Sequence, residues 1–597
     1  MKSSYNRDPA TGIWSSARIN QFNYSDGDET EAELMKIVSE ATDVSTVSAE
    51  LAGAIVDWPT EYHLSAARHN LLRPFNIRPS DSVLELGCGC GALTRYFGET
   101  GAAVVAVEGS MRRAEIAAAR CRGLSNVSIY CDNLITFASD DKFDFVTLIG
   151  VLEYAPRFIE GSDPITKVLS HARSFLKQGG TLILAIENQL GLKYFNGCSE
   201  DHLGIPYYGI NDLYRDHEPI TFGRQALSNC LHKADFSEQT FFYPFPDYKL
   251  PSVILSGAAL ADERLNIPDL LIHQSGRTHP ETWQRAFAED LAWRVAIRNR
   301  MLPDLANSFL VLARASGSVP RQVGWLAKIY SRGRRRASYQ IETTIAPDAT
   351  NCLRVIKRKV FPTAHLPQAP SFRQVVDDAE YVVGTLLIGK IHRAMALEAG
   401  IDELAACFTP WLDFLLSHVT TNNKGDRLLP PDFVDCSPAN LIEAHDGTTR
   451  YFDAEWVSNA PIPFAWTVVR GIVYSLIDCL ENVSLQGMTY RQFVTAITAR
   501  NGVELASGDL CLADDCESHL VAQCHTNHAA TPHLSELLDT PLFLTARLAQ
   551  RSTDYRQSLA WHQAELARVK RTVSWRITAP MRASWNLLLR LTGKRPE

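Results

Sequence analysis

The sequence predicts an α/β protein with a doubly wound parallel sheet, a second region of α+β type and a helical C-terminal tail. Short β-branched runs alternate with helical stretches from Ser82 to Ser256, and this alternation is typical of parallel βαβ units. The first run ends in a glycine-rich turn, GCGCG, at residues 87–91. The chain has 597 residues, more than one hydrophobic core can organise, so about two to four domains are expected.

The first domain is predicted to span residues 61–260. Residues 61–75, EYHLSAARHNLLRPF, have the pattern of an amphipathic helix that leads into the first strand. Two later runs, QTFFYPFPDY and LPSVILS, lie close together and predict an antiparallel hairpin at an edge of the sheet. The five runs predicted as parallel strands are SVLEL, AVVAVE, VSIYC, FDFVTLIG and TLILAIE.

The rest of the chain is divided by its periodicity and composition. Residues 326–500 hold two strand-like segments, ASYQIETTI and CLRVIKRKVF, which are followed by helical patterns. A basic run, SRGRRRAS, lies between the first domain and these segments. The other predicted segments are an N-terminal helical extension at 1–60, a helical connector at 261–325, an irregular or helical segment at 501–550 and a basic helical tail at 551–597.

Composition and charge exclude several classes of function. Apolar residues make up 46% of the chain and charged residues 21%, which is ordinary for a soluble globular protein. The net charge of −8 gives no electrostatic reason to expect a nucleic-acid partner. The 13 cysteines are scattered without paired metal spacing, which predicts reduced thiols in a cytoplasmic protein. Neither a signal peptide nor a spanning apolar run is expected.

The glycine turn is compatible with more than one ligand. A nucleotide-binding P-loop requires a Lys after its last glycine, and none follows here. The dinucleotide pattern is met through Gly87, Gly89 and Ala92, with Glu108 placed to bind a ribose. However, Glu85 lies two residues before the first glycine, where an acid would repel pyrophosphate. The same acid would attract a cationic ligand such as S-adenosylmethionine.

Five ordered motifs strengthen the second interpretation. The series ELGCGCG, VEGS, YCDNL, LIGVLEY and KQGGTLIL resembles the class I S-adenosylmethionine-dependent methyltransferases, over roughly residues 82–256. The resemblance implies a Rossmann-like methyltransferase domain. The alternative is that the glycines form only a structural turn and that Glu108 is a solvated strand end. The resemblance implies these cofactor contacts: Glu85, Gly87, Gly89 and Gly91 at the methionine end, Glu108 at the ribose, Asp132 and Asn133 at the adenine, and Gly150 and Val151 beneath the cofactor.

The acceptor of the methyl group is expected near residues 187–202. This polar stretch leaves the fifth strand at the sheet edge where ligands bind in open α/β sheets. Transfer to a hydroxyl oxygen needs a base, and His202 and Glu187 are the candidates, whereas a phosphate acceptor needs none. The alternative is that Glu200, Asp201 and His202 only order a loop and that Glu187 and Asn188 cap a helix.

Three further stretches narrow the expected acceptor. DWPTEYHLS, the IENQLGLKYF segment with its EDH, and YPFPDYKLP are similar to methyltransferases encoded with bacterial surface-polysaccharide (O-antigen, lipopolysaccharide) assembly. This resemblance implies a glycan or lipid-linked glycan acceptor. It also implies that Tyr62, His63 and Arg68 close over the cofactor or the acceptor, although they are equally compatible with ordinary surface positions on the first helix.

A second set of motifs resembles the aminoglycoside-phosphotransferase-like branch of the kinase fold. Asp435 and Asn440 in DCSPAN have the spacing of a kinase catalytic loop, and Asp453 follows in YFDAE. The resemblance implies that Asp435 is the base and that Lys357, in RVIKRK, binds ATP. Asn440 and Asp453 would then hold Mg²⁺, so ATP and Mg²⁺ are the implied cofactors.

This kinase-like segment departs from the family at several positions. No glycine-rich loop precedes Lys357, and Phe433 stands where the family carries a His. Asp453 is followed by Ala454 rather than Gly. An active kinase, a kinase-like binding domain without catalysis, and an unrelated fold therefore all remain open. If both halves act, a kinase would phosphorylate a sugar hydroxyl and the methyltransferase would cap the phosphate.

The tail predicts an interaction surface. Residues 551–597 carry ten Lys or Arg against three Asp or Glu, together with Trp575 and Trp585. A basic helix with tryptophans suits a membrane surface or an acidic partner such as a glycosyltransferase, and a solvated or coiled-coil helix end is the alternative. We therefore expect a cytoplasmic methyltransferase, peripheral at the inner face of the membrane. A non-catalytic scaffold of polysaccharide assembly and a small-molecule methyltransferase of secondary metabolism are the alternatives.

Overall fold

A single large sheet organises the computed structural model, which describes residues 5–16, 27–159, 161–276, 285–315, 323–331, 335–364, 370–444, 446–477, 479, 482–526 and 533–542. Within these residues the sheet has fourteen strands in the order β1-β2-β5-β4-β3-β6-β7-β10-β8-β9-β11-β12-β13-β15. The predicted basic tail at 551–597 lies outside the described residues, as does the centre of the basic run SRGRRRAS. Among the described residues, no helix combines the length and the apolar character needed to cross a bilayer.

All five predicted parallel strands are present at the positions expected. The chain builds β3, β4 and β5 toward one side and then returns to add β6 and β7 on the other. The strand order therefore reverses between β3 and β6, and ligands bind at such a switch point in open α/β sheets. The bounds are β3 (Ser82–Leu86), β4 (Ala103–Glu108), β5 (Val127–Cys131), β6 (Phe143–Ile149) and β7 (Leu176–Glu187).

Helices cover both faces of this parallel part, as a doubly wound fold requires. Val83 and Phe145 pack with Phe97 of α4 on one face, while Leu84 and Leu148 belong to the core on the other face, beneath α7 and α9. The helices around the parallel sheet are α4 (Ala92–Glu99), α5 (Met111–Arg120), α6 (Ala155–Phe158), α7 (Pro164–Ser174), α8 (Leu192–Phe195) and α9 (Arg224–Lys233).

The predicted helical connector at 261–325 is wrong in one part. Its residues Ser308–Arg314 form strand β10, which lies antiparallel between β7 and β8. The run SFLVLA is short and continuously apolar, a pattern that does not distinguish a buried strand from a buried helix. The rest of the connector includes η4 (Gly257–Ala261), which begins just before it, α10 (Ile267–Leu270), α11 (Glu289–Arg298) and α12 (Leu302–Leu305).

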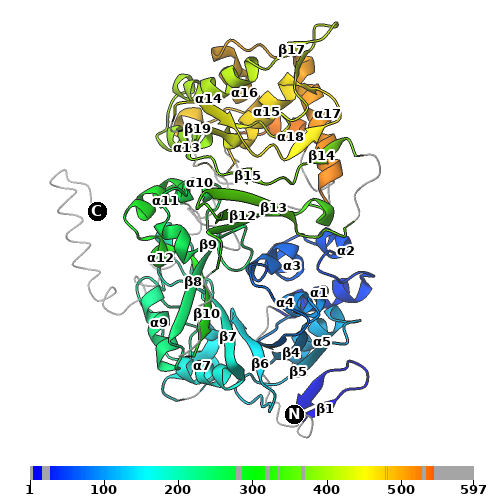
Figure 1. The fold of residues 1–597 in the computed structure, drawn as a ribbon, viewed down its shortest axis with the longest axis vertical. Coiled ribbons are helices and arrows are strands. Elements are labelled where there is room, and N and C mark those ends of the chain that lie inside the picture. The colour runs from blue at the N-terminus through cyan, green and yellow to red at the C-terminus, as the bar shows by residue number, and fades with distance from the viewer. Residues whose placement is uncertain are drawn as a thin grey trace, which may run out of the picture.

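The predicted hairpin forms, but it does not lie at the edge of the sheet. Strands β8 and β9 pair antiparallel, and the sheet continues beyond them into the second half of the chain. A single sheet thus joins the two halves (Figure 1). These strands are β8 (Glu238–Phe245), β9 (Val253–Ser256), β11 (Ala327–Tyr330), β12 (Ile341–Pro347), β13 (Leu353–Lys359) and β15 (Ala379–Glu380).

The N-terminal segment is only partly helical, in contrast to the prediction for residues 1–60. Strands β1 (Tyr5–Arg7) and β2 (Trp14–Ser16) form a hairpin that extends the sheet beside β5. The single helix predicted over 61–75 is also wrong, because the chain turns extended at Ser65 and continues as a short 3₁₀ segment. The helical elements here are α1 (Asp28–Glu40), α2 (Ala49–Gly53), α3 (Trp58–Leu64) and η2 (Ala66–Leu71).

The second half has its own core of helices above β12 and β13 (Figure 1). Trp411 and Trp466 are buried at its centre, and Glu517 of α17 accepts a hydrogen bond from the Trp466 indole at 2.9 Å. The segment 501–550, predicted to be irregular or helical, contains the 18-residue helix α17. The helices are α13 (Leu387–Ala396), α14 (Ile401–Leu416), α15 (Phe464–Tyr474), α16 (Tyr490–Arg500), α17 (Ser507–Cys524) and α18 (Leu534–Leu538).

Short strands and 3₁₀ turns complete the second half, and three of the strands (β16, β19 and β20) form a small antiparallel sheet. The strands are β14 (Phe372–Gln374), β16 (Gly384–Leu386), β17 (Thr420–Thr421), β18 (Arg427–Leu429), β19 (Leu441–Ala444), β20 (Thr449–Tyr451), β21 (Trp456–Ser458) and β22 (Ile462–Pro463). Among the described residues, the remaining 3₁₀ turns are η3 (Leu152–Tyr154), η5 (Ala337–Tyr339), η6 (Pro438–Asn440) and η7 (Val483–Leu485).

Candidate active site

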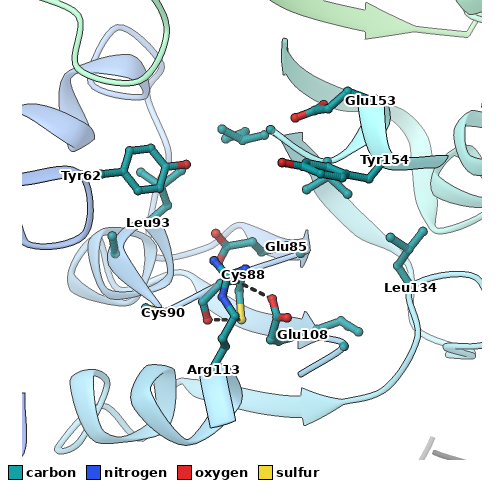
Figure 2. A pocket seen from close by; sticks show the side chains of 18 of the residues that line it. Tyr62, Glu85, Cys88, Cys90, Leu93, Glu108, Arg113, Leu134, Glu153 and Tyr154 are labelled. Carbon is teal, nitrogen blue, oxygen red and sulfur yellow. Dashed lines mark hydrogen bonds between the residues drawn. The ribbon is translucent and has the colours of Figure 1, made fainter. Parts of the chain in front are cut away.

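A cavity of about 590 Å³ opens at the carboxyl ends of β3, β4, β6 and β7, at the switch point of the sheet. Most of the predicted cofactor residues line it, and so do the predicted bases Glu187 and His202. Gly91 is the exception. Figure 2 shows Glu85, Glu108 and Arg113 at one end of the cavity, with Glu153 and Tyr154 at the other and Tyr62 across from them. The predicted cofactor residues that line the cavity are Glu85, Gly87, Gly89, Glu108, Asp132, Asn133, Gly150 and Val151.

The glycines of the turn are required for two different reasons. Gly87 has φ +81°, and a Cβ there would lie 2.5 Å from a methyl carbon of Val151, so this glycine lets the turn lie against the segment after β6. Gly91 has φ +79°, and a Cβ there would lie 2.7 Å from the Cα of Ala117. Gly91 therefore allows α4 to pack on α5 and does not itself face the cavity.

The two cysteines between the glycines are packing residues. Cys88 and Cys90 are 6% and 3% exposed and belong to apolar clusters beside the turn. Burial raises the pKa of the Cys88 thiol well above its usual range, so it stays protonated. Both side chains therefore fill the space between the glycines.

Glu108 holds the glycine turn and also faces the cavity. Its Oε2 accepts a hydrogen bond from the Gly89 amide at 2.8 Å, and its Oε1 accepts one from the Ser110 amide at 3.0 Å. A carboxylate has about four lone-pair sites. About two acceptor sites therefore remain, which matches the two hydroxyl groups that a ribose would donate.

Asp132 accepts more hydrogen bonds from the protein itself than the sequence suggested. Its carboxylate accepts hydrogen bonds from the Tyr5 hydroxyl at 2.6 Å, from the Asn133 amide at 2.8 Å and from the Thr136 hydroxyl at 3.0 Å. Burial, followed by the Asp132 carboxylate, raises the pKa of Tyr5. Tyr5 was not predicted, and it brings the N-terminal hairpin against the side of the cavity that Asp132 and Asn133 line.

Glu85 is a buried acid beside a single hydrogen-bond donor. It is 4% exposed, and its Oε2 accepts a hydrogen bond from the Thr94 hydroxyl at 2.6 Å. Burial raises the pKa of Glu85 to about 8. Among the described residues it makes no ion pair, so a cationic ligand would be the group that favours its ionised form.

The opposite end of the cavity gathers His202, Glu153 and Glu187. The Nδ1 of His202 lies 2.8 Å from Glu200 Oε1. Its Nε2 lies 3.6 Å from Glu153 Oε1 and 3.8 Å from Glu187 Oε2. Burial lowers the pKa of His202, but the surrounding carboxylates outweigh it and raise this pKa well above its usual range. Burial raises the pKa of Glu153 as well.

Two lysines fix the position of Glu187 and of the loop that carries His202. Lys249 Nζ lies 2.5 Å from Glu187 Oε1 and 2.7 Å from Asp201 Oδ1, and Lys193 Nζ lies 2.7 Å from the other oxygen of Asp201. Asn188 is not the N-cap of α8, because that position is Gly191. Its side-chain NH₂ group donates to the carbonyls of Asp304 and Ala306 just before β10, and its Oδ1 accepts from the Leu190 amide at 3.0 Å. The loop-ordering alternative thus describes Glu200 and Asp201, while His202 faces the cavity.

Sequence comparison now identifies this region. Residues 60–238 match a family model described as a methyltransferase domain. Residues 60–238 therefore form a methyltransferase domain. It is of the S-adenosylmethionine-dependent class, as the motif series implied. Strand β10, which completes the sheet, lies beyond the matched residues.

Curated relatives cover part of this methyltransferase domain. A demethylmenaquinone methyltransferase of Tropheryma whipplei (strain Twist) is 30% identical over 117 residues, which cover 20% of this chain and 46% of that protein. The protein of the same description from strain TW08/27 matches with the same values. The chain spans about half the length of the curated relatives it matches.

Solved structures resemble the chain at lower identity. A magnesium protoporphyrin IX methyltransferase (ChlM) from Synechocystis PCC 6803 with bound SAH is 16% identical, with a TM-score of 0.25, over 35% of this chain and 86% of that one. The N-methyltransferase NodS from Bradyrhizobium japonicum WM9 is 21% identical, with a TM-score of 0.18, over 20% and 67%. At these TM-scores the likeness contributes nothing to the assignment.

The cavity is also lined by Tyr248 and Lys249, which the sequence analysis did not single out, and by Tyr62, His63 and Arg68, which it expected over the cofactor or the acceptor. Lys249 and Tyr248 come from the β8–β9 loop, and Arg68 donates to the backbone carbonyls of both. Arg68 also donates to the Tyr62 hydroxyl at 3.0 Å, and Trp58, Tyr62, His63 and Arg68 all line the cavity. Strand β8 runs parallel to β7, so its carboxyl end lies at the same sheet edge. The sequence did not indicate this, because β10, which lies between the two strands, was not predicted as a strand.

In the second half, the structure brings the four predicted kinase-like residues together. Lys357 on β13 makes an ion pair with Asp453, which follows β20 and has φ +57°. The Asn440 amide donates to the backbone carbonyl of Asp435 at 2.9 Å. Burial raises the pKa of Asp435 to about 7, and Asp453 is among the charges that raise it further.

Asp435 and the nearby Glu455 each have a cationic neighbour that the sequence did not reveal. Arg470 lies 3.4 Å from Asp435, and Arg335 makes a two-point ion pair with Glu455. Phe433 stacks on Phe414 in the position where the kinase family carries a His. We call Lys357, Asp453, Arg335, Glu455, Asp435 and Arg470 the second charged cluster.

Proposed function

We propose that this chain transfers a methyl group from S-adenosylmethionine to a hydroxyl oxygen of a surface glycan or of its lipid-linked precursor. The observation that carries the proposal is the position of His202, Glu153 and Glu187 in the cavity whose other end holds Glu85 and Glu108. Bound S-adenosylmethionine supplies an electrophilic methyl group on a sulfonium. The glycine turn and the buried Glu85 fit its cationic amino-acid end.

The acceptor end supplies the base. The proton of an incoming hydroxyl passes into the group formed by His202, Glu153 and Glu187. Glu153 receives it more readily than an ordinary carboxylate, because burial has raised its pKa. Glu200 holds the imidazole so that Nε2 faces the other two acids. Lys249 keeps Glu187 in place through an ion pair of 2.5 Å.

The surroundings favour a neutral sugar hydroxyl over a phosphate. Glu153, Glu187 and Asp201 line this end of the cavity, and a phosphate would add further negative charge among buried carboxylates. Trp58 and Tyr154 line the same cavity and present flat apolar faces, on which the C–H face of a sugar ring can pack.

The test uses purified full-length protein with S-adenosylmethionine and a lipid-linked glycan fraction. We expect mass spectrometry to find one added methyl group, bound to a sugar oxygen. A methyl group on an amine or on a phosphate would overturn the hydroxyl acceptor. Calorimetry that detects no S-adenosylmethionine binding would end the enzyme proposal and favour the non-catalytic scaffold. Methylation of a diffusible small molecule alone would favour the secondary-metabolism alternative.

A second candidate function concerns the other half of the chain. We propose that the second charged cluster binds ATP and Mg²⁺ and phosphorylates a glycan hydroxyl. It is supported by the contact between Lys357 and Asp453, residues 96 positions apart, beside Asp435 and Asn440. Incubation with radiolabelled ATP and magnesium tests it. An unlabelled glycan, together with no ATP binding by calorimetry, would leave the region without this function.

The basic segment 551–597 suggests where the enzyme acts in the cell and what it contacts. We propose that residues 551–597 bring the enzyme to an anionic membrane surface or to a glycosyltransferase at the inner face of the membrane, because this segment carries ten cationic residues. Sedimentation with vesicles that contain anionic lipid tests the membrane arm. Equal sedimentation of a chain that ends at residue 550 would overturn it.

A further inference from the structure

We infer that Glu153, Glu187 and His202 hold a divalent metal ion that binds the acceptor oxygen. Each side chain offers one ligand atom, and these atoms all lie within 4.8 Å of one another. His202 Nε2 lies 3.6 Å and 3.8 Å from the two carboxylate oxygens. Two ligands about 2.1 Å from one ion lie about 3.0 to 3.4 Å apart at octahedral or tetrahedral angles, so binding of an ion would draw these side chains closer together by a few tenths of an ångström up to about 1 Å.

The first support is unsatisfied hydrogen-bonding capacity. Glu153 Oε2 and Glu187 Oε2 are buried and have no hydrogen-bond partner among the described residues. The two residues are 1% and 0% exposed, so bulk water does not compensate. Buried carboxylate oxygens without partners are costly, and a cation placed between them removes that cost.

The second support is the set of contacts around the three ligands. Glu200 accepts from the Nδ1 side of His202 at 2.8 Å, which directs Nε2 into the cavity. A metal-bound imidazole usually donates its other ring N–H to a carboxylate in this way. Lys249 likewise binds Oε1 of Glu187 and leaves Oε2 toward His202. The atoms left available are therefore the ones that an ion would use.

The third support is net charge. With His202 neutral, the linked network has four carboxylates and two ammonium groups, a difference of two negative charges. A divalent ion would neutralise both excess negative charges. One proton on His202 would neutralise only one of them. Buried charge without compensation is strongly unfavourable. The six charged members are Glu153, Glu187, Glu200, Asp201, Lys193 and Lys249.

The donor set indicates the class of ion and its use. Two carboxylates with one imidazole suit Mn²⁺ or Zn²⁺, and three protein ligands leave positions for the acceptor. The role of the ion rests on the proposed function. The acceptor hydroxyl binds the ion, and its proton passes to the oxygen of Glu153 that does not hold the ion. The hydroxyl oxygen then forms the new O–CH₃ bond as the S–CH₃ bond breaks, and S-adenosylhomocysteine leaves as a neutral thioether.

The experiment titrates MnCl₂, and separately ZnCl₂, into full-length protein stripped with a chelator. We expect one Mn²⁺ per chain by calorimetry and by electron paramagnetic resonance. Glu153→Gln and Glu187→Gln should each weaken binding by about tenfold or more, and Glu200→Gln by about tenfold to a hundredfold. Glu108→Gln is the matched control, since Glu108 lines the other end of the same cavity and should leave Mn²⁺ affinity unchanged.

The outcomes separate this inference from the proposed function. If neither ion binds, or if Glu153→Gln binds Mn²⁺ like the native protein, the metal site is overturned. Methyl transfer that persists in chelator then leaves the proposed function intact. If Mn²⁺ binds as expected and no glycan hydroxyl is methylated, the metal site stands and the proposed acceptor fails. Thermal unfolding of each variant distinguishes loss of a ligand from loss of the fold.

Discussion

The cofactor cavity and the second charged cluster treat buried charge differently. In the cavity, Glu85 has no ion-pair partner among the described residues, and oxygens of Glu153 and Glu187 lack any hydrogen-bond partner there. In the second charged cluster, Asp453 pairs with Lys357, and Glu455 pairs with Arg335. A buried acid without a cationic or hydrogen-bonding partner indicates a site for a ligand that would supply one. An acid that already forms an ion pair within the protein needs no ligand to stabilise it.

The two regions are therefore expected to differ in how much a bound ligand stabilises the folded protein. The cavity is expected to gain stability from cationic ligands, because they remove an existing imbalance. A nucleotide in the second charged cluster would have to replace ion pairs that are already formed. The following predictions test the comparison, in order of decreasing effect on methyl transfer.

Glu153→Gln should have the largest effect. Removing the charge of Glu153 takes away the group that receives the hydroxyl proton, so we expect methyl transfer to fall by about 10²- to 10⁴-fold. S-adenosylmethionine affinity should stay within about twofold, since Glu153 lies at the acceptor end. Single-turnover assays and calorimetry measure the two quantities. Glu108→Gln should show the reverse pattern, and equal losses in both variants would show that the cavity does not have two distinct ends.

Gly87→Ala should weaken cofactor binding by about tenfold or more. The new Cβ would lie 2.5 Å from Val151 and push apart the turn and the segment after β6. Gly123→Ala is a matched control, because Gly123 has a similar φ of +83° and a Cβ added there would meet no atom within 4 Å. The control carries only the backbone strain of about 1 kcal/mol. Calorimetry should separate the variants, and equal affinities would remove the steric explanation.

Cofactor binding should depend on pH through Glu85. Burial raises the pKa of Glu85 to about 8, so the acid is neutral at pH 6 and ionised above pH 8. Because the ionised form attracts a cationic ligand, the Kd for S-adenosylmethionine should fall about tenfold from pH 6 to pH 7 and level off above pH 8. Glu85→Gln should abolish this slope. A slope that survives in the variant would assign it to another group.

The same shift has a consequence for stability. The pKa of Glu85 is higher in the folded protein than its ordinary value, so its favourable contribution is complete below pH 4.5 and decreases up to about pH 8. Without cofactor, Glu85→Gln should therefore unfold at a higher temperature than the native protein at pH 8. Thermal unfolding at pH 4.5 and pH 8 checks the sign.

Arg335→Met should have the smallest effect on methyl transfer, less than about twofold, because the second charged cluster is self-contained. It should lower the free energy of unfolding by about 2 kcal/mol, since Glu455 would keep a mostly buried charge without its partner. Arg335→Met combined with Glu455→Gln should restore part of that loss. Denaturant unfolding measures both variants, and a large loss of methyl transfer would show that the two regions are coupled.

Local patterns were sufficient for the parallel strands and the cofactor end. The runs SVLEL and AVVAVE, the glycine turn and Glu108 are short-range features whose geometry follows from a few adjacent residues. Such patterns failed where they were ambiguous or where the contact was distant. SFLVLA is apolar without a decisive period and became β10, and Ser65 divided a helix that the pattern predicted as continuous.

The sequence by itself determined the fold class, the five parallel strands and most of the predicted residues at the end of the cavity that holds the glycine turn. Only the tertiary structure brought Glu153, Glu187 and His202 together. Glu153 lies in the turn after β6, Glu187 is the last residue of β7, and His202 lies in the loop after β7. The tertiary structure alone showed that Lys249 and Glu200 orient them, and that Tyr5 reaches Asp132 across the sheet edge. Charge balance is a property of neighbours in space, and a linear pattern does not contain it.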